Sequence, residues 1–186
     1  MENHYFTSDG IQVKNRAFLL GDAIKVSFFV RHAELIMDEE CYFFLMASMR
    51  KMRMNSPLSY TLEFFQSLFR HDVIEGGGIT DGIIHFQVFR NTDGITLSKS
   101  SVAYFYEVLQ MEDVLALQPR PLEMDLIKEI NVNNNLLSNI RVHSPENIYA
   151  GIYAQENDLD DVILLNPNKR IARATSGNLL FLEGNV

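Results

Sequence analysis

The sequence predicts an α+β fold with two domains, a small α+β domain followed by a second domain of α/β type. Strand-type and helix-type segments are mixed before residue 117, and a strand–helix–strand pattern follows after residue 122. Between them, Gln118-Pro119-Arg120-Pro121 forms a stiff linker, because two prolines this close forbid a helix. We therefore expect domains at residues 1–117 and 122–186, joined by residues 118–121.

The first domain begins with a turn signal at Ser8-Asp9-Gly10. Ala23 to Arg31 is rich in β-branched and aromatic residues, which favours a strand. Leu35-Ile36-Met37 is expected to form a short second strand. Asp38 then has the character of an N-cap, and the helix that it begins is expected to run to about Arg53.

A second helix is expected from Tyr60 to about His71, because Leu62, Phe65 and Phe69 recur at helical spacing. Gly76-Gly77-Gly78 then breaks the chain as a flexible loop. We do not interpret it as a phosphate cradle, since it lacks a strand before it and a helix after it.

Apolar and β-branched runs predict five more strands: Gly82 to Arg90, Ser101 to Leu109, Leu122 to Val132, Val162 to Leu165 and Leu179 to Leu182. Asn91-Thr92-Asp93-Gly94 connects the first two, and Asn166-Pro167-Asn168 is a hairpin-like turn. Ser144, followed by Pro145 and an acidic first turn, begins a helix that ends near Asn157. Three of its side chains are expected to face inward: Ile148, Tyr149 and Ile152.

Composition and charge fit a soluble globular protein. The chain has 186 residues, of which 47% are hydrophobic and 22% charged, and its net charge is −8 at pH 7. That charge argues against nucleic-acid or anionic-membrane partners, which need clustered Lys and Arg. The N-terminus does not resemble a signal peptide, and no uncharged apolar run approaches the ~20 residues of a membrane span. The single cysteine, Cys41, fits a buried thiol in a reducing compartment, so we expect a cytoplasmic protein.

The titratable residues do not predict a metal site. The histidines are scattered, without His-x-x-x-His spacing or a neighbouring cysteine. Asp158, Asp160 and Asp161 lie close together after a helix, but the glycine and the later glutamate of a calcium loop are missing. We therefore interpret this segment as a solvated acidic loop.

Several further segments occur in an order that points to one family. They are Asn15-Arg16-Ala17-Phe18-Leu19-Leu20-Gly21-Asp22, Leu45-Met46-Ala47-Ser48-Met49-Arg50, Val88-Phe89-Arg90-Asn91, Ser138-Asn139-Ile140, Asp160 to Asn166, and Ser176-Gly177-Asn178-Leu179. Together they resemble the class IV, or fold-type IV, pyridoxal-phosphate-dependent aminotransferases, a family that includes branched-chain aminotransferases and aminodeoxychorismate lyase. No single segment is specific, and the order of the segments carries the resemblance.

The resemblance implies a small α+β domain, a linker and a larger domain, with the cofactor between the domains. It also implies a homodimer, in which each subunit helps to close the other's site. The family continues well beyond the position of Phe181, so the second domain is expected to be incomplete here. Two alternatives stay open: a natural short form and a fragment of a longer protein.

The resemblance fails at the positions that carry the chemistry. The family has a lysine after Ser-Asn-Ile, where this chain has Arg141, and a glutamate opposite the ring nitrogen, where it has Arg173. A guanidinium forms no comparable imine, and a cation beside the ring nitrogen reverses the electrostatics. The family's phosphate-binding arginine falls at Phe44, and its Phe-Glu pair falls at Lys25 and Val26. We therefore assign no catalytic residue and expect no bound cofactor.

Three hypotheses follow. The first is a pseudoenzyme that keeps the fold without Schiff-base chemistry, with Arg141, Arg173 and Arg16 as a candidate site for a small carboxylate or phosphate. The alternative is an active pyridoxal-phosphate-dependent aminotransferase or aminodeoxychorismate lyase, acting on amino acids or aminodeoxychorismate, that uses an unusual residue in place of the family lysine. Lys128 and Lys169 are the only lysines in the expected second domain, and neither stands just ahead of the helix that begins at Ser144. The third is a non-functional remnant of a longer enzyme.

Overall fold

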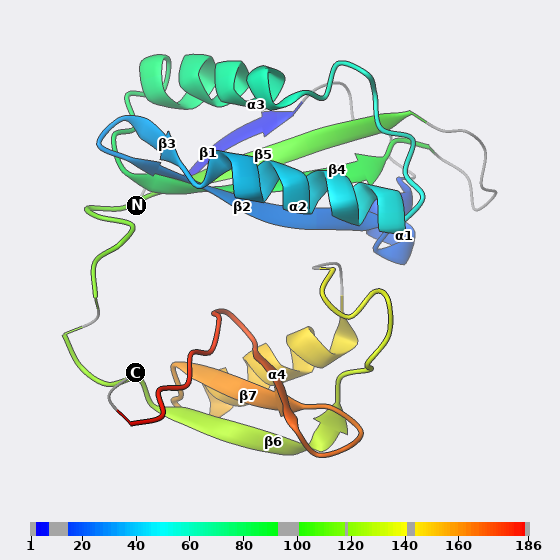
Figure 1. Ribbon diagram of the computed structural model, residues 1–186, viewed down its shortest axis with the longest axis vertical. Helices are drawn as coiled ribbons and strands as arrows, with labels where there is room; N and C mark the ends of the chain where they lie inside the picture. Colours follow the sequence, from blue (N-terminus) through cyan, green and yellow to red (C-terminus); the bar gives the residue numbers. More distant parts are fainter. Residues whose placement is uncertain (1–2, 8–14, 93–100, 118, 141–143, 185–186) are drawn as a thin grey trace. The chain divides into compact units, whose positions relative to one another are not determined.

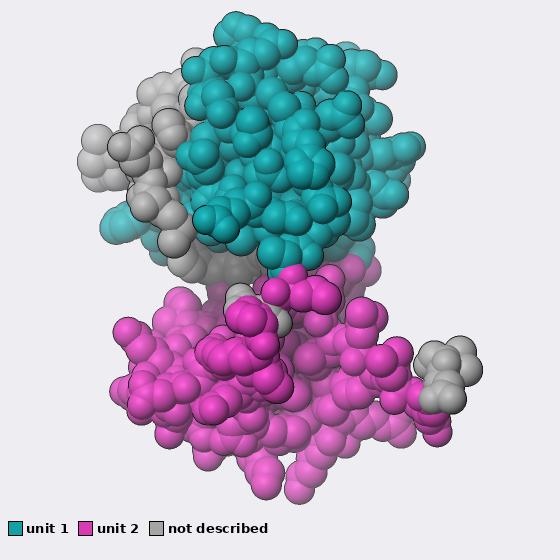
Figure 2. All heavy atoms as spheres, turned by 90° about the vertical axis from the view of Figure 1, so that its left-hand side faces the viewer, with its two compact units in different colours: residues 1–116, 140–142 teal, residues 117–139, 143–186 magenta. Residues whose placement is uncertain are grey.

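The computed structural model describes residues 3–7, 15–92, 101–117, 119–140 and 144–184. The chain divides into two compact units, residues 1–116 with 140–142, and residues 117–139 with 143–186 (Figure 2). We call them unit 1 and unit 2. None of the helices in the described residues has the length and apolar composition that a membrane span requires.

Unit 1 is a five-stranded antiparallel sheet with its strands in the order β1-β5-β4-β2-β3 (Figure 1). The strands are β1 (Asn3–Thr7), β2 (Ala23–Arg31), β3 (Glu34–Ile36), β4 (Gly82–Arg90) and β5 (Val102–Gln110). The helices are α1 (Arg16–Leu20), α2 (Asp38–Lys51) and α3 (Leu62–Phe69). The bounds of β2 and β4 are those predicted from the sequence, and β5 is shifted by one residue.

The two faces of this sheet differ because side chains alternate along each strand. One face carries the core, in which residues of β2 and β4 such as Phe28 and Phe86 are buried with Phe65 and Phe69 of α3. The ring centroids of Phe28 and Phe69 lie 4.8 Å apart. The alternate residues of β2, β4 and β5 lie on the opposite side, which we call the second face of the sheet.

The start of α2 differs from the prediction. Met37, with a φ of +54°, is the N-cap and makes no side-chain capping bond. Asp38 is the first helical residue instead of the cap, and its carboxylate accepts a hydrogen bond from Gln66 Nε2 at 2.7 Å. A tertiary contact with α3 thus uses the oxygen that a local cap would need, and the N-cap prediction for Asp38 is wrong.

The predicted second helix ends earlier and changes type. After α3 the chain continues as a π-helix, η1 (Arg70–Glu75). Tyr106 of β5 donates a hydrogen bond from its hydroxyl to Asp72 Oδ2 at 2.8 Å, which anchors η1 to the sheet. A Cβ at Gly77 would lie 2.7 Å from the Val73 carbonyl oxygen, so close packing requires the glycine there. The predicted break at the three glycines is confirmed, because η1 ends at its C-cap, Gly76, and the flexibility of this segment stays a prediction.

Unit 2 is a three-stranded mixed sheet with a helix, α4 (Pro145–Glu156). Its strands are β6 (Met124–Asn131), β7 (Asp161–Leu165) and β8 (Ile171–Ala174), in the order β6-β7-β8. β6 and β7 are parallel, with α4 in the connection, and β7 and β8 form an antiparallel hairpin. The predicted start of α4 is confirmed, because Ser144 Oγ accepts from Asn147 N at 3.4 Å and Pro145 is the first helical residue.

Two predictions for unit 2 are wrong. Leu179 to Leu182 is not a strand, and Leu180, Phe181 and Leu182 are 91%, 72% and 85% exposed. A four-residue apolar run does not define a strand by itself, and the strand of this region is β8. On α4 the predicted inward residues Ile148, Tyr149 and Ile152 are about half exposed, at 54%, 45% and 52%. The small Ala150 faces the core instead, together with the partly buried Tyr153 and Ala154.

Asp161 is buried at the start of β7 and is not part of a solvated loop, which corrects that interpretation. One of its oxygens accepts from the backbone N–H groups of Val162 at 2.7 Å and Thr175 at 3.1 Å. The other accepts from Ser176 N at 3.1 Å and Ser176 Oγ at 2.6 Å. Burial raises the pKa of Asp161, but these hydrogen bonds outweigh burial and lower it below its usual value.

Asp161→Asn is expected to lower the free energy of unfolding by about 2 kcal/mol at neutral pH, because an amide NH₂ would meet donors that the carboxylate accepts. Since the folded-state pKa is lowered, this stabilisation is present above the unfolded pKa of ~3.9 and is lost as pH falls through the folded pKa. Urea unfolding between pH 7 and pH 3 measures the difference in free energy of unfolding between the wild-type protein and the variant.

The matched control is Asp158→Asn, which changes the charge equally at an exposed neighbour with a φ of +54°. An Asp161→Asn cost equal to that of the control, or one that does not shrink at low pH, would contradict the role given to this carboxylate.

Candidate functional site

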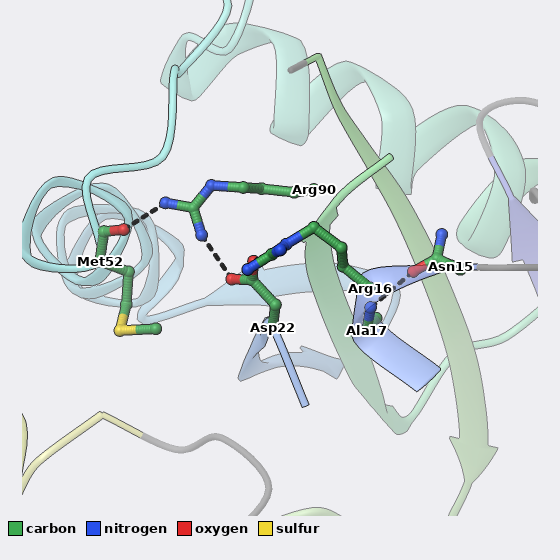
Figure 3. A network of polar contacts seen from close by, with 6 residues as sticks. All are labelled: Asn15, Arg16, Ala17, Asp22, Met52 and Arg90. Atoms are coloured by element: carbon green, nitrogen blue, oxygen red, sulfur yellow. Dashed lines mark hydrogen bonds and ion pairs between the residues drawn. The ribbon is translucent and has the colours of Figure 1, made fainter. Parts of the chain in front are cut away.

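Arg16, one of the three candidate anion-binding arginines, is held in a buried polar network (Figure 3). Asn15 caps α1 by accepting from Ala17 N at 2.7 Å, and Gly21, with a φ of +64°, ends the helix. This short turn brings Asp22 back toward Arg16, whose Nε donates to Asp22 Oδ2 at 2.8 Å.

Arg90, from the end of β4, completes the network. Its Nη1 donates to Asp22 Oδ1, and its Nη2 donates to the carbonyl oxygen of Met52, the C-cap of α2 (Figure 3). Arg16, Asp22 and Arg90 are each 8% exposed. Arg16 therefore connects α1 to the sheet through this network, and its part in anion binding stays a prediction.

Arg173 lies on β8 and is partly buried within unit 2. Its Nη1 donates to the Ser138 carbonyl oxygen at 3.1 Å, and its Nη2 donates to Asn147 Oδ1 at 2.8 Å. The hydrogen bond from Ser144 chiefly lowers the pKa of Glu146, and the charge of Arg173 contributes to this shift. The guanidinium thus connects β8, the segment before position 141 and the first turn of α4.

The substituted positions of unit 1 fall on both faces of the sheet. Phe44 of α2 is partly buried and packs against the core, so no charged group occupies that position. Val26 is 5% exposed and belongs to the core. Lys25, its neighbour, lies on the second face. Arg141 lies outside the residues that the structure describes.

The two alternative lysines are both on the surface. Lys128 is exposed on β6, and Lys169 is exposed in the β7–β8 turn with a φ of +58°. Neither forms an ion pair within the part of the chain that the structure describes.

A groove of about 670 Å³ runs along β8 and the segment after it. It is lined by Arg170, Arg173, Asn178, Leu179 and Phe181 among others. The groove combines two guanidiniums with apolar side chains, and the sequence offered no spacing that would have placed these residues together.

Two further kinds of site can be compared with the structure, a cysteine nucleophile and a metal centre. Burial, followed by the charges of Glu40 and Asp38, raises the pKa of the Cys41 thiol to about 11, so the thiolate is scarce at neutral pH. Among the described residues no three His, Cys, Asp or Glu side chains come together as metal ligands.

The contact between Ser27 and His85 could not be predicted from the sequence. Ser27 Oγ lies 3.2 Å from His85 Nδ1, on neighbouring strands of the unit 1 sheet. The alternation of β4 places His85 on the second face, but the strand register that pairs it with Ser27 cannot be read from the sequence.

Comparison with known proteins identifies the fold. No protein-family model matches the sequence, and no curated protein matches it significantly. Among solved structures, an enzyme assigned as a 4-amino-4-deoxychorismate lyase from Legionella pneumophila matches with a TM-score of 0.76 and 15% sequence identity, over 90% of this chain and 61% of that one.

The branched-chain amino acid aminotransferase of Escherichia coli matches with a TM-score of 0.72 and 16% identity, over 89% of this chain and 58% of that one. A hypothetical aminotransferase from Mycobacterium tuberculosis, in its PLP-bound form, matches with a TM-score of 0.71 and 12% identity, over 94% and 66%. The fold-type IV architecture implied by the sequence resemblance is thereby confirmed. At these identities the likeness shows the fold alone, and this chain spans 58% to 66% of the length of these structures.

Asp22→Asn is expected to destabilise the protein by about 3–5 kcal/mol, because it leaves two buried guanidiniums without their counter-charge. Chemical unfolding followed by circular dichroism measures the change. The control is Asp160→Asn, which weakens the exposed ion pair with Arg120 and should cost much less than Asp22→Asn. Equal costs for the two variants would show that the buried network is not a major source of stability.

Proposed function

We propose that this chain is a fold-type IV protein that has lost Schiff-base catalysis and now binds small anions. The single observation that carries the proposal is the chemistry of Arg173. The sequence resemblance aligns it with the glutamate that faces the cofactor ring nitrogen. A carboxylate there accepts a hydrogen bond from the protonated nitrogen and keeps it protonated, which makes the ring an electron sink.

A guanidinium has the opposite character. It offers only donors, it does not lose its proton, and here its two terminal nitrogens already donate to Ser138 and Asn147. Pyridoxal phosphate, whose ring nitrogen needs an acceptor, does not fit this donor set. We therefore derive no catalytic step through the cofactor.

Two further positions support the same conclusion. The lysine position holds Arg141, whose delocalised lone pair forms no comparable imine. The phosphate-binding position holds Phe44, which packs against apolar residues and makes no charge-assisted hydrogen bond.

The groove along β8 is the part of unit 2 that suits a small anion. Arg170 and Arg173 both line it, and Arg170 is exposed, with no ion pair to a carboxylate in the described part of the chain. Forked N–H donors bind carboxylate and phosphate oxygens well, and the charge persists at every physiological pH.

The alternative function is that of an active pyridoxal-phosphate-dependent aminotransferase or lyase. The observation in its favour is the likeness to solved enzymes, one of them in a PLP-bound form. It would require Lys128 or Lys169 to take the role of the family lysine.

The purified protein is expected to be colourless and to stay so after incubation with pyridoxal phosphate and removal of the excess, because Arg141 cannot form the imine that absorbs visible light. Absorption spectra before and after borohydride treatment measure this. A visible band that borohydride converts into a stable adduct on Lys128 or Lys169 would establish the alternative.

The anion-binding part of the proposal is measured in the same preparation by thermal shift with phosphate and acetate at modest salt. Stabilisation that is lost in Arg170→Ala, and kept in a Lys169→Ala variant of the neighbouring exposed residue, supports the β8 groove. Equal stabilisation of both variants would remove the groove from the proposal.

We also propose a homodimer. Phe18, Leu19 and Leu20 of α1 are 86%, 52% and 54% exposed and form a run of apolar surface that a subunit contact would cover. Phe18→Ser is expected to shift the dimer toward monomer in sedimentation experiments. Leu58→Ser, at an isolated residue that is 99% exposed, should leave the dimer intact. A monomeric wild-type protein at micromolar concentration would overturn the proposal.

A further inference from the structure

The second face of the unit 1 sheet carries a row of polar side chains that the proposed function does not use. Ser27 of β2 pairs in register with His85 of β4, and His85 pairs with Glu107 of β5. Lys25 lies two residues before Ser27 on the same face and pairs in register with Gln87. All five side chains are partly buried, so they form a built polar cluster at the centre of the sheet.

The charged groups in this row, Lys25 and Glu107, do not form an ion pair with each other. Within the residues that the structure describes, no carboxylate forms an ion pair with Lys25. Arg31, also on this face, is held by Asp113 at 3.1 and 3.2 Å. The charged groups that act on His85 are therefore Lys25 from β2 and Glu107 from β5.

The state of His85 follows from these neighbours. Burial is the main cause that lowers the pKa of His85, the Lys25 ammonium lowers it further, and Glu107 opposes both. The imidazole is therefore neutral at pH 7. An anion placed beside Lys25 would offset the contribution of the Lys25 ammonium to this lowering and so favour a second proton on the ring.

The Ser27 hydroxyl is placed to accept a hydrogen bond from the protonated ring of His85. In the imidazolium both ring nitrogens donate, so Nδ1–H can donate to Ser27 Oγ, which lies 3.2 Å away. The Ser27 hydroxyl hydrogen is then available to a ligand, next to the ammonium of Lys25. Glu107 lies on the other side of the ring and stabilises its positive charge.

We propose that Lys25, Ser27 and His85 form a binding site for a small carboxylate, in which Lys25 is the permanent cation and His85 takes up a proton as the ligand binds. The site goes beyond the proposed function. It lies in unit 1, it uses neither Arg170 nor Arg173, and it does not depend on whether Schiff-base chemistry is lost. It also accounts for the lysine at a position where the resembling family has phenylalanine.

The test uses acetate, which remains ionised between pH 6 and pH 8, with chloride at equal ionic strength as the control anion. Calorimetric titration of the wild-type protein in two buffers of different ionisation enthalpy should show proton uptake. The affinity should fall by up to about tenfold per pH unit above the pKa of the free imidazole.

The variants separate the roles. Lys25→Met is expected to abolish the acetate binding that takes up a proton and to leave binding at the β8 groove unchanged, whereas Lys128→Met, at an exposed lysine of β6, should bind like the wild type. His85→Gln keeps a side chain that can hydrogen-bond Ser27 and should retain weak binding without pH dependence or proton uptake. Circular dichroism and the unfolding temperature confirm that each variant is folded.

Absence of proton-coupled acetate binding by the wild-type protein would overturn the proposal, and so would proton uptake that survives Lys25→Met. Binding that is lost in Arg170→Ala but not in Lys25→Met would assign the anion to the β8 groove. That outcome rejects this site and supports the function proposed for unit 2.

Discussion

Two buried guanidiniums, those of Arg16 and Arg90, contact the same carboxylate, that of Asp22, and this shared contact determines where four elements of unit 1 meet. A buried cation is tolerated only when its donors are satisfied, so α1, β2 and β4 must approach within hydrogen-bond distance of one carboxylate. The fourth element is α2, whose C-terminal carbonyl at Met52 accepts from Arg90. Such a carbonyl is one of the unsatisfied acceptors at a helix end, and a cation is the favoured partner there. The segment from Asn15 to Asp22 is thus explained by structure before any ligand is considered.

Arg173 shows how the same chemistry supports a fold where it does not suit a cofactor. Its forked donors hold three segments of unit 2 that lie far apart in sequence, since Ser138 and Asn147 are 35 and 26 residues away. The fold-type IV architecture is therefore compatible with a cation at this position. The backbone oxygen of Ser138 and the amide oxygen of Asn147 accept the hydrogen bonds of the guanidinium. The architecture depends on the backbone and packing of a strand, whereas catalysis depends on particular side chains. The architecture can therefore be kept while those side chains change.

The elements that could be predicted are those whose signal is local. The alternation in β2 and β4 and the Ser144-Pro145 start of α4 each depend on neighbouring residues, and the structure has them at the predicted places. The failures concern partners that are distant in sequence. Gln66, rather than a helix N–H, uses the Asp38 carboxylate, and Arg90 reaches Asp22 across 68 residues. The Ser27–His85 contact spans 58 residues. The resemblance flagged Arg141, Arg173 and Phe44 by position, but only three-dimensional register shows which side chains meet.

The edge position of β8 has a consequence for association. Among the described strands β8 ends its sheet, so the backbone N–H and C=O groups on its outer side could pair with a strand of another molecule. Its sequence carries Arg173, and the residues just before it are Lys169 and Arg170. Positive charge along an edge makes antiparallel pairing of two copies of the same strand repulsive. Lys169, Arg170 and Arg173 therefore act against the fibre-like stacking that a bare, apolar edge would invite.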